Sequence, residues 1–100
     1  MPLILFFYPS FKKSFKSLDF NQREIVQRIL KAIEIYYLSN CQLSETQKAE
    51  PGFFYKQLRK PYHEAGIEGK IRVVIERDKS ECFAVFAGNH DQIKRFLANQ

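Results

Sequence analysis

The length, composition and charge of the chain limit what it can be. One hundred residues, of which 45% are hydrophobic and 15% aromatic, predict a single globular domain over residues 1–100 and exclude a disordered chain. Sixteen basic against 11 acidic residues give a formal net charge of +5. This charge favours a polyanionic partner, such as nucleic acid, an anionic membrane or an acidic protein, without choosing between them.

The cysteines and the first residues bear on the compartment. Cys41 and Cys82 lie far apart without the spacing of metal ligands, so we predict neither a disulfide nor a zinc site. The apolar run in MPLILFFYPS lacks a basic leader and is too short for a signal peptide or a membrane span. We therefore expect a cytoplasmic protein that does not associate with membranes.

A strand and a first helix are predicted at the beginning of the chain. Residues 3–8 are apolar and rich in strand formers, and Pro9 ends the run. Residues 10–18 then place their apolar side chains at helical spacing, with lysines on the other side. Ser10 is the candidate N-cap of this helix.

A second helix carries the strongest helical pattern. Asn21 with Glu24 three residues later resembles a capping box at its start, and the helix is expected to end near Ser39. Its apolar stripe consists of Ile25, Val26, Ile29, Leu30, Ile33 and Tyr37. Residues 40–52 are polar and end in Pro-Gly, so we interpret them as a loop.

The second half predicts a meander of strands and a short last helix. The four strands are expected at residues 53–59, 62–67, 70–77 and 82–88. Tight turns are expected at Glu68-Gly69 and at residues 78–81, and Asn89 with Gln92 resembles a capping box before a helix at 91–98. This order predicts an α+β fold in which two N-terminal helices pack on one face of a twisted antiparallel sheet and leave the other face open.

Arg72 lies in a predicted strand whose neighbouring residues are apolar and typical of a buried sheet. Because side chains alternate along a strand, it points to the face opposite Ile71 and Val73. On an open face its guanidinium offers a fixed fork of donors that suits a phosphate. The alternative, which periodicity alone favours, is a cross-strand ion pair with Glu64 or Glu76, or a solvated side chain.

A short basic cluster precedes the second of these strands. Its members are Lys56, Arg59 and Lys60. If the meander pairs as expected, they lie near Arg72 and form a basic patch, with Tyr55 and Tyr62 available to stack bases. The alternative is a solvated basic edge that discourages association between strands.

His63 and His90 are the two histidines of the chain. His90 follows the last strand, where it can act as a general acid or base or simply hydrogen-bond locally at the start of a helix. His63 directly precedes Glu64, so only one of these two side chains can share the face of Arg72. Two histidines on separate elements predict no metal site, and the sequence has no Gly-rich phosphate loop, GxSxG or HExxH motif. We expect no cofactor.

Several segments together resemble the RelE/ParE superfamily of bacterial type II toxins. They are LILFFYPSFKKSFKSL, LRKPYHEAGIEGKIRVV and GNHDQI, in this order and with the long amphipathic helix after the first. The resemblance covers nearly the whole chain. It implies two helices against a twisted antiparallel sheet and a cognate antitoxin that wraps the toxin, for which an acidic protein would suit the charge of +5.

The resemblance implies one of two activities. RelE-like members cut mRNA on the ribosome without a metal, by attack of the 2′-hydroxyl on the adjacent phosphate. ParE-like members inhibit DNA gyrase. A metal-free mRNA endoribonuclease that inhibits translation is the first hypothesis, and the alternatives are a gyrase inhibitor or a non-enzymatic module that binds an antitoxin.

The resemblance also assigns roles to particular residues. Arg72, His90 and Lys56 would be catalytic: Arg72 steadies the extra negative charge and His90 acts as general base or acid. The residues that would bind or orient the RNA are Arg59, Lys60, His63 and Glu64, with Glu64 orienting Arg72. One departure stands out, because no tyrosine follows Tyr62, whereas some nucleases of the superfamily stack a late tyrosine on the substrate base. Phe86 or Phe96 would have to replace it.

Overall fold

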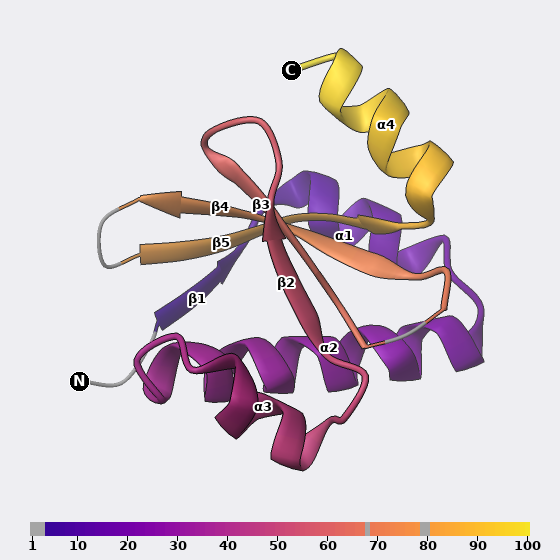
Figure 1. Ribbon diagram of the computed structural model, residues 1–100. Helices are drawn as coiled ribbons and strands as arrows, with labels where there is room; N and C mark the ends of the chain where they lie inside the picture. The colour runs from indigo at the N-terminus through magenta and orange to yellow at the C-terminus, as the bar shows by residue number, and fades with distance from the viewer. Residues whose placement is uncertain (1–3, 68, 79–80) are drawn as a thin grey trace.

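The computed structural model describes residues 4–67, 69–78 and 81–100, and over these it confirms the predicted α+β fold (Figure 1). The strands are β1 (Ile4–Phe7), β2 (Phe54–Gln57), β3 (Tyr62–Gly66), β4 (Arg72–Asp78) and β5 (Glu81–Gly88). The helices are α1 (Pro9–Lys16), α2 (Phe20–Leu38), α3 (Leu43–Ala49) and α4 (His90–Ala98). The described strands form one sheet in the order β1-β5-β4-β3-β2.

The sheet is mixed. Strands β2 to β5 form the antiparallel meander that the sequence predicts, whereas β1 pairs in parallel with β5, with Phe6 opposite Phe83. A parallel pair needs a long connection, and here the helices α1 to α3 and the strands β2 to β4 lie between the two strands along the chain. The direction of β1 could not be predicted from alternation, because a pattern of period two is the same for both directions.

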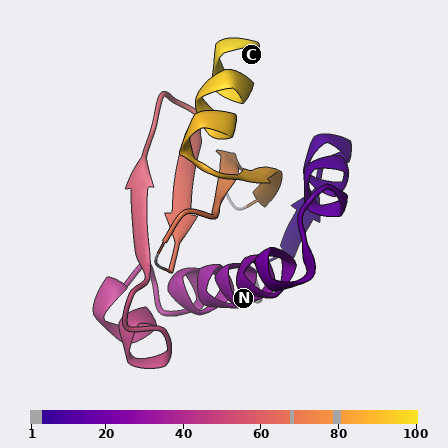
Figure 2. The same ribbon diagram turned by 90° about the vertical axis from the view of Figure 1, so that its right-hand side faces the viewer.

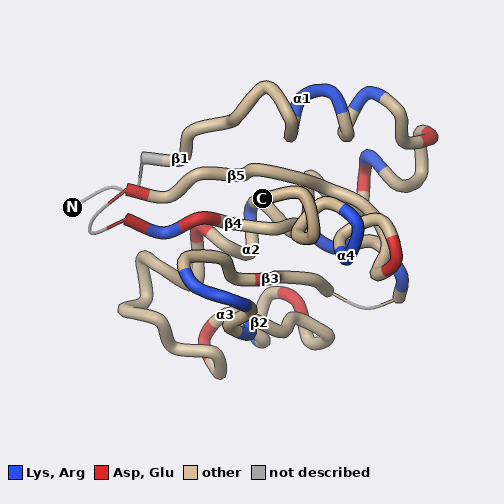
Figure 3. Tube along the Cα trace, turned by 90° about the horizontal axis from the view of Figure 1, so that it is seen from above, with Lys and Arg blue, Asp and Glu red and all other residues tan. Residues whose placement is uncertain are grey.

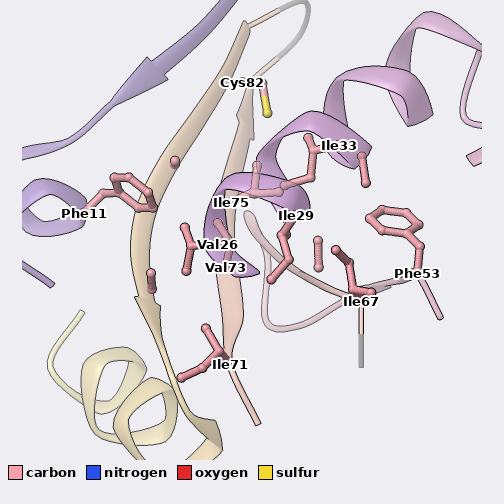
Figure 4. Packing of buried hydrophobic residues seen from close by; sticks show 14 of the residues in the cluster. Phe11, Val26, Ile29, Ile33, Phe53, Ile67, Ile71, Val73, Ile75 and Cys82 are labelled. Carbon is pink, nitrogen blue, oxygen red and sulfur yellow. The ribbon is translucent and has the colours of Figure 1, made fainter. Parts of the chain in front are cut away.

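Helix α2 covers one face of the sheet, which we call the α2 face, and α4 lies over part of the opposite face, the α4 face (Figures 1 and 2). Buried aliphatic side chains of α2 and the sheet meet on the α2 face, as Figure 4 shows. They include Val26, Ile29, Ile33, Ala65, Val73 and Ile75. The face that we expected to be open is thus partly covered, because the last helix folds back across it.

A β-bulge lies where β4 meets β5. Val74 pairs with Phe86 and the next residue, Ile75, pairs with Ala84, so Val85 is an extra residue in β5. Val85 and Phe86 both join the small apolar cluster under α4, in which Val74 and Ile93 are also buried. The bulge therefore supplies adjacent residues of β5 to one cluster, which strict alternation does not allow.

The helix starts differ in part from the prediction. Helix α1 begins at Pro9 with Tyr8 as N-cap, and the Ser10 hydroxyl donates instead to the Val85 carbonyl at 2.6 Å. Helix α2 has its capping box at Asp19 and Gln22, not at Asn21 and Glu24. Both pairs have the spacing of a capping box, and the one that immediately precedes the first helical turn is used.

The capping box predicted at Asn89 and Gln92 is confirmed. Residues 40–52, predicted as a loop, contain α3 instead. Thr46 is the buried side chain of this seven-residue helix, so it has no apolar stripe from which to predict it. An ion pair of 2.7 Å between Arg28 and Glu50 ties its end to α2.

Some predicted features lie outside the described residues. They are Leu3 of the first strand, Glu68 of the predicted turn, and residues 79–80. Gly69, the second residue of the predicted turn, has a φ of +77°, which suits glycine. Within the described residues, no helix is both long and apolar enough to cross a membrane.

Candidate functional site

Arg72 begins β4 in a row that contains two glycines. Gly88 on β5 pairs with it, and the register of β3 and β4 continues to place Gly66 on its other side, followed by Phe54 on β2. A Cβ at Gly66 would lie 2.6 Å from Phe54 Cε1 and 3.4 Å from Arg72 Cγ. The missing side chain therefore provides the space in which Phe54 and Arg72 meet above the sheet.

A buried carboxylate on the same face holds Arg72. Glu64 is 2% exposed, and Arg72 Nη1 donates to its Oε1 at 2.8 Å, while Lys56 Nζ lies 3.7 Å from its Oε2. The sequence allowed an ion pair of Arg72 with either Glu64 or Glu76, and the structure forms it with Glu64. Glu76 instead accepts a hydrogen bond of 2.9 Å from the Tyr8 hydroxyl. Two cations share one carboxylate here, so the site keeps a positive charge that suits an anion.

Arg72 has donor capacity left for such an anion. Its Nε is buried and has no hydrogen-bond partner, so an anion would meet the terminal nitrogens of the guanidinium, since the side chain as a whole is 24% exposed. The guanidinium carbon lies 5.3 Å from the centroid of the Phe54 ring. An arginine fixed by a carboxylate and an aromatic ring loses little side-chain entropy when it binds a phosphate.

A cavity of about 380 Å³ opens beside Arg72 and brings His90 to the same place. It is lined by Gly69, Lys70, Arg72, Asn89, His90 and Asp91. His90 is exposed in the first turn of α4, and the capping box of Asn89 fixes where that turn begins. Cations and an imidazole around one cavity can bind a phosphate and exchange a proton with a bound molecule.

Lys70 and Asp91 are residues of this cavity that the sequence reasoning missed. A signal existed for Lys70, because it precedes Arg72 by two residues and alternation places both on one face. Nothing comparable indicated Asp91, which reaches the cavity only because α4 folds back over the sheet.

The predicted basic cluster is divided. Lys56 lies beside Glu64, as described, but Arg59 Nη2 donates to the Leu97 carbonyl at the end of α4 at 2.7 Å. Lys60 is exposed next to it in the connection between β2 and β3, which Figure 3 shows as a basic segment. Arg59 and Lys60 do not line the cavity beside Arg72. The Arg59 contact stabilises the position of α4.

His63 lies on the α2 face, away from Arg72. It pairs with Ile75, and its ring stacks on Tyr55 with 5.3 Å between ring centroids. Burial, and then the charge of Arg77, lower the pKa of His63 below its ordinary value of 6.5. Its Nδ1 is buried without a hydrogen-bond partner. His63 therefore belongs to an aromatic cluster under the sheet and not to the group around Arg72.

The aromatic residues expected to stack on bases are used in packing. Tyr55 stacks on Tyr36 at 4.5 Å, and its hydroxyl hydrogen-bonds to that of Tyr37, whose pKa burial raises to about 12. Phe86 stacks on Phe96 at 4.7 Å under α4. Tyr62 meets Phe96 edge-on at 6.5 Å.

Cys41 is exposed and Cys82 buried, and both are free. Burial raises the pKa of the Cys82 thiol to about 11, so this thiol is neutral at physiological pH. Over the described ranges, no three His, Cys, Asp or Glu side chains gather closely enough to hold a metal ion.

The sequence matches no protein-family model and no curated protein sequence. Solved structures do resemble it. A RelB–RelE antitoxin–toxin complex from Methanococcus jannaschii aligns with a TM-score of 0.63 at 16% identity, over 91% of this chain and 96% of that chain. A copper-bound mutant toxin from Helicobacter pylori aligns with a TM-score of 0.62 at 20% identity, over 93% of this chain and 99% of that chain. The E. coli DinJ–YafQ complex aligns with a TM-score of 0.59 at 14% identity, over 91% of this chain and 97% of that chain. The chain therefore has the fold of RelE-type toxins, as the sequence resemblance predicted.

Proposed function

We propose that this protein is the toxin of a type II toxin–antitoxin system and that it cleaves mRNA on the ribosome. The observation that supports this most is the meeting of Arg72 and His90 at one cavity, although they lie on different elements of the fold. A phosphate bound there would have fixed cations on one side and an imidazole on the other.

The chemistry would be transesterification within the RNA. The 2′-hydroxyl attacks the adjacent phosphorus, the bond to the 5′-oxygen breaks, and a 2′,3′-cyclic phosphate and a 5′-hydroxyl are formed. The phosphoryl oxygens gain negative charge in the transition state, which Arg72 and Lys70 would stabilise. His90 would accept the proton of the 2′-hydroxyl or supply one to the leaving oxygen.

The remaining predicted residues have different roles in this proposal. Glu64 would position Arg72, and Lys56 would attract a neighbouring phosphate of the strand. Arg59 would act indirectly by holding α4, on which His90 lies. His63 pairs with Ile75 and stacks on Tyr55 on the α2 face, so this proposal gives it no role in binding RNA.

An antitoxin is the partner that we propose together with the ribosome and mRNA. The solved complexes of similar fold contain a toxin with RelB or with DinJ. The net charge of +5 suits an acidic partner, and the protein would act in the cytoplasm as one domain over residues 1–100. Inhibition of DNA gyrase is the second candidate, since no tyrosine follows Tyr62 and the basic surface would then bind protein.

Pulsed expression in bacteria, with incorporation of labelled amino acids and thymidine followed in parallel, tests the proposal. Protein synthesis should stop first, and mRNAs should be cut within reading frames. Arg72→Ala and His90→Gln should each slow cleavage by about 10²-fold or more. Arg23→Ala, which changes an exposed arginine of α2, should arrest growth like the wild type.

Two results would contradict the proposal. If DNA synthesis stopped first, the gyrase hypothesis would replace it. If Arg72→Ala arrested translation as fast as Arg23→Ala, then the site around Arg72 would not be the catalytic one.

A further inference from the structure

Phe54 is an aromatic side chain that the core does not use. Its neighbour Phe53 is 1% exposed within the core, whereas Phe54 is half-buried and belongs to neither apolar cluster of the described residues. It lies on the α4 face of β2, an edge strand of the sheet. Its position therefore needs an explanation other than packing of the core.

Two cations lie on the same face of the sheet as this ring, and both contact Glu64. Arg72 contacts the ring directly, with its guanidinium carbon 5.3 Å from the ring centroid. Lys56, two residues further along β2, is on the same face and 54% exposed. An aromatic ring beside cations is an arrangement with which proteins bind single-stranded nucleic acid, because the ring stacks on a base while the cations contact the phosphate backbone.

Gly66 is the residue that makes this arrangement fit. The Phe54 ring edge occupies the space of the missing Cβ, which would lie 2.6 Å from Cε1 and 2.7 Å from Cζ. With any larger residue at this position the ring would be displaced from the sheet. The ring is thus held low beside Arg72 by a feature of the backbone and not by a hydrophobic pocket.

We propose that Phe54 is the platform on which one unpaired base of the substrate RNA stacks, next to the phosphate that Arg72 binds. This inference rests on the proposed function and adds that the substrate must be single-stranded at this nucleotide, since a paired and stacked base cannot reach the ring.

Binding of a fluorescently labelled RNA hexamer to the purified protein, measured at several salt concentrations, tests the inference. Phe54→Leu keeps an apolar side chain but removes the ring, so affinity should fall about 5- to 150-fold at every salt concentration. Phe54→Tyr should bind like the wild type. Phe20→Leu is the matched control, because Phe20 is 69% exposed on α2, and it should have no effect. Thermal unfolding should show that all three variants are folded.

The salt dependence of RNA binding distinguishes base stacking on Phe54 from the phosphate contact of Arg72. Arg72→Ala should reduce the slope of log affinity against log salt by about 0.7, the value for one phosphate contact on a single strand, whereas Phe54→Leu should leave it unchanged. If Phe54→Leu bound the hexamer within twofold of the wild type, or if the wild type did not bind it, the inference would be wrong. If Phe54→Leu weakened binding but the wild type did not arrest translation, the proposed function would fail while the base platform stood.

Discussion

At the scale of single residues, the burial of Glu64 decides how the cationic site is held. Its carboxylate is 2% exposed and contacts two cations, of which Arg72 is 24% and Lys56 54% exposed. A buried carboxylate is stable only with such partners, and they in turn are oriented by it. The ion pair and the proposed phosphate site are therefore compatible, because Glu64 uses one side of the guanidinium and leaves other donors.

Replacing Glu64 by alanine should lower the free energy of unfolding by about 1–3 kcal/mol, since the buried part of Arg72 loses its acceptor. Urea denaturation measures this. Glu45→Ala is a suitable control, because the ion pair of Glu45 with Lys48 is exposed at both ends, and it should cost less than about 0.5 kcal/mol. Equal losses in the two variants would mean that Glu64 does not hold the site together.

At the scale of elements, α1 lies along the edge of the sheet beyond the end of β1, beside β5 (Figure 3). Two serines of this helix satisfy backbone groups of β5: the Ser10 hydroxyl donates to the Val85 carbonyl at 2.6 Å, and Ser14 Oγ accepts from the Ala87 N–H at 3.0 Å. An edge strand normally exposes these groups to other chains. The helix therefore protects the second half of β5 from pairing with another strand.

Ser14→Ala should destabilise the protein by about 1–3 kcal/mol, because it leaves the buried Ala87 N–H without an acceptor. Thermal or urea unfolding would detect the change. Ser44→Ala in α3 alters an exposed serine and should change stability by less than about 0.5 kcal/mol. A Ser14 variant as stable as the Ser44 variant would show that water replaces the serine at this edge.

At the scale of the whole molecule, burial of His63 makes folding sensitive to pH. Its pKa is lowered in the folded state, so below about pH 6.5 the unfolded chain binds a proton that the folded protein does not. Stability should therefore fall as the pH drops below this value. It should level off once the pH is below the folded-state pKa.

His63→Phe should reduce this slope between pH 6.5 and 5 while keeping the stack on Tyr55. Urea unfolding at a series of pH values provides the measurement, and above pH 7 the two proteins should show parallel curves. The series should stop at pH 5, because Glu50, whose pKa the ion pair with Arg28 lowers below 4.5, adds its own loss of stability in more acid solution. An unchanged slope would exclude His63 as the cause.

Local patterns in the sequence were enough to predict most of the fold. The apolar stripe of α2 and the alternation of β4 identified their elements, and the resemblance supplied their arrangement. Helix α3 was missed because its stability comes from contacts with the rest of the chain, including the pair Arg28–Glu50, and not from a stripe of its own. The parallel pairing of β1 was missed because it joins distant parts of the chain.

The candidate site could be predicted only in part. Alternation placed Arg72 on the right face and separated His63 from Glu64, but it could not decide which of the two would share that face. It also could not show that α4 brings His90 to Arg72, or that Tyr55 would be used in a stack with Tyr36. These facts depend on how elements distant in sequence pack together.

The bulge at Val85 has a consequence for how the chain can vary. Side chains normally alternate along a strand, but Val85 and Phe86 both join the cluster under α4, so the bulge absorbs the extra residue and Ala87 and Gly88 still pair with Val73 and Arg72. The side of the sheet on which α4 leaves β5, and with it the meeting of His90 and Arg72, therefore does not depend on the extra residue. A chain that lacked Val85 would keep the pairs of β5 with β4 on both sides of this position and would lose one buried side chain under α4.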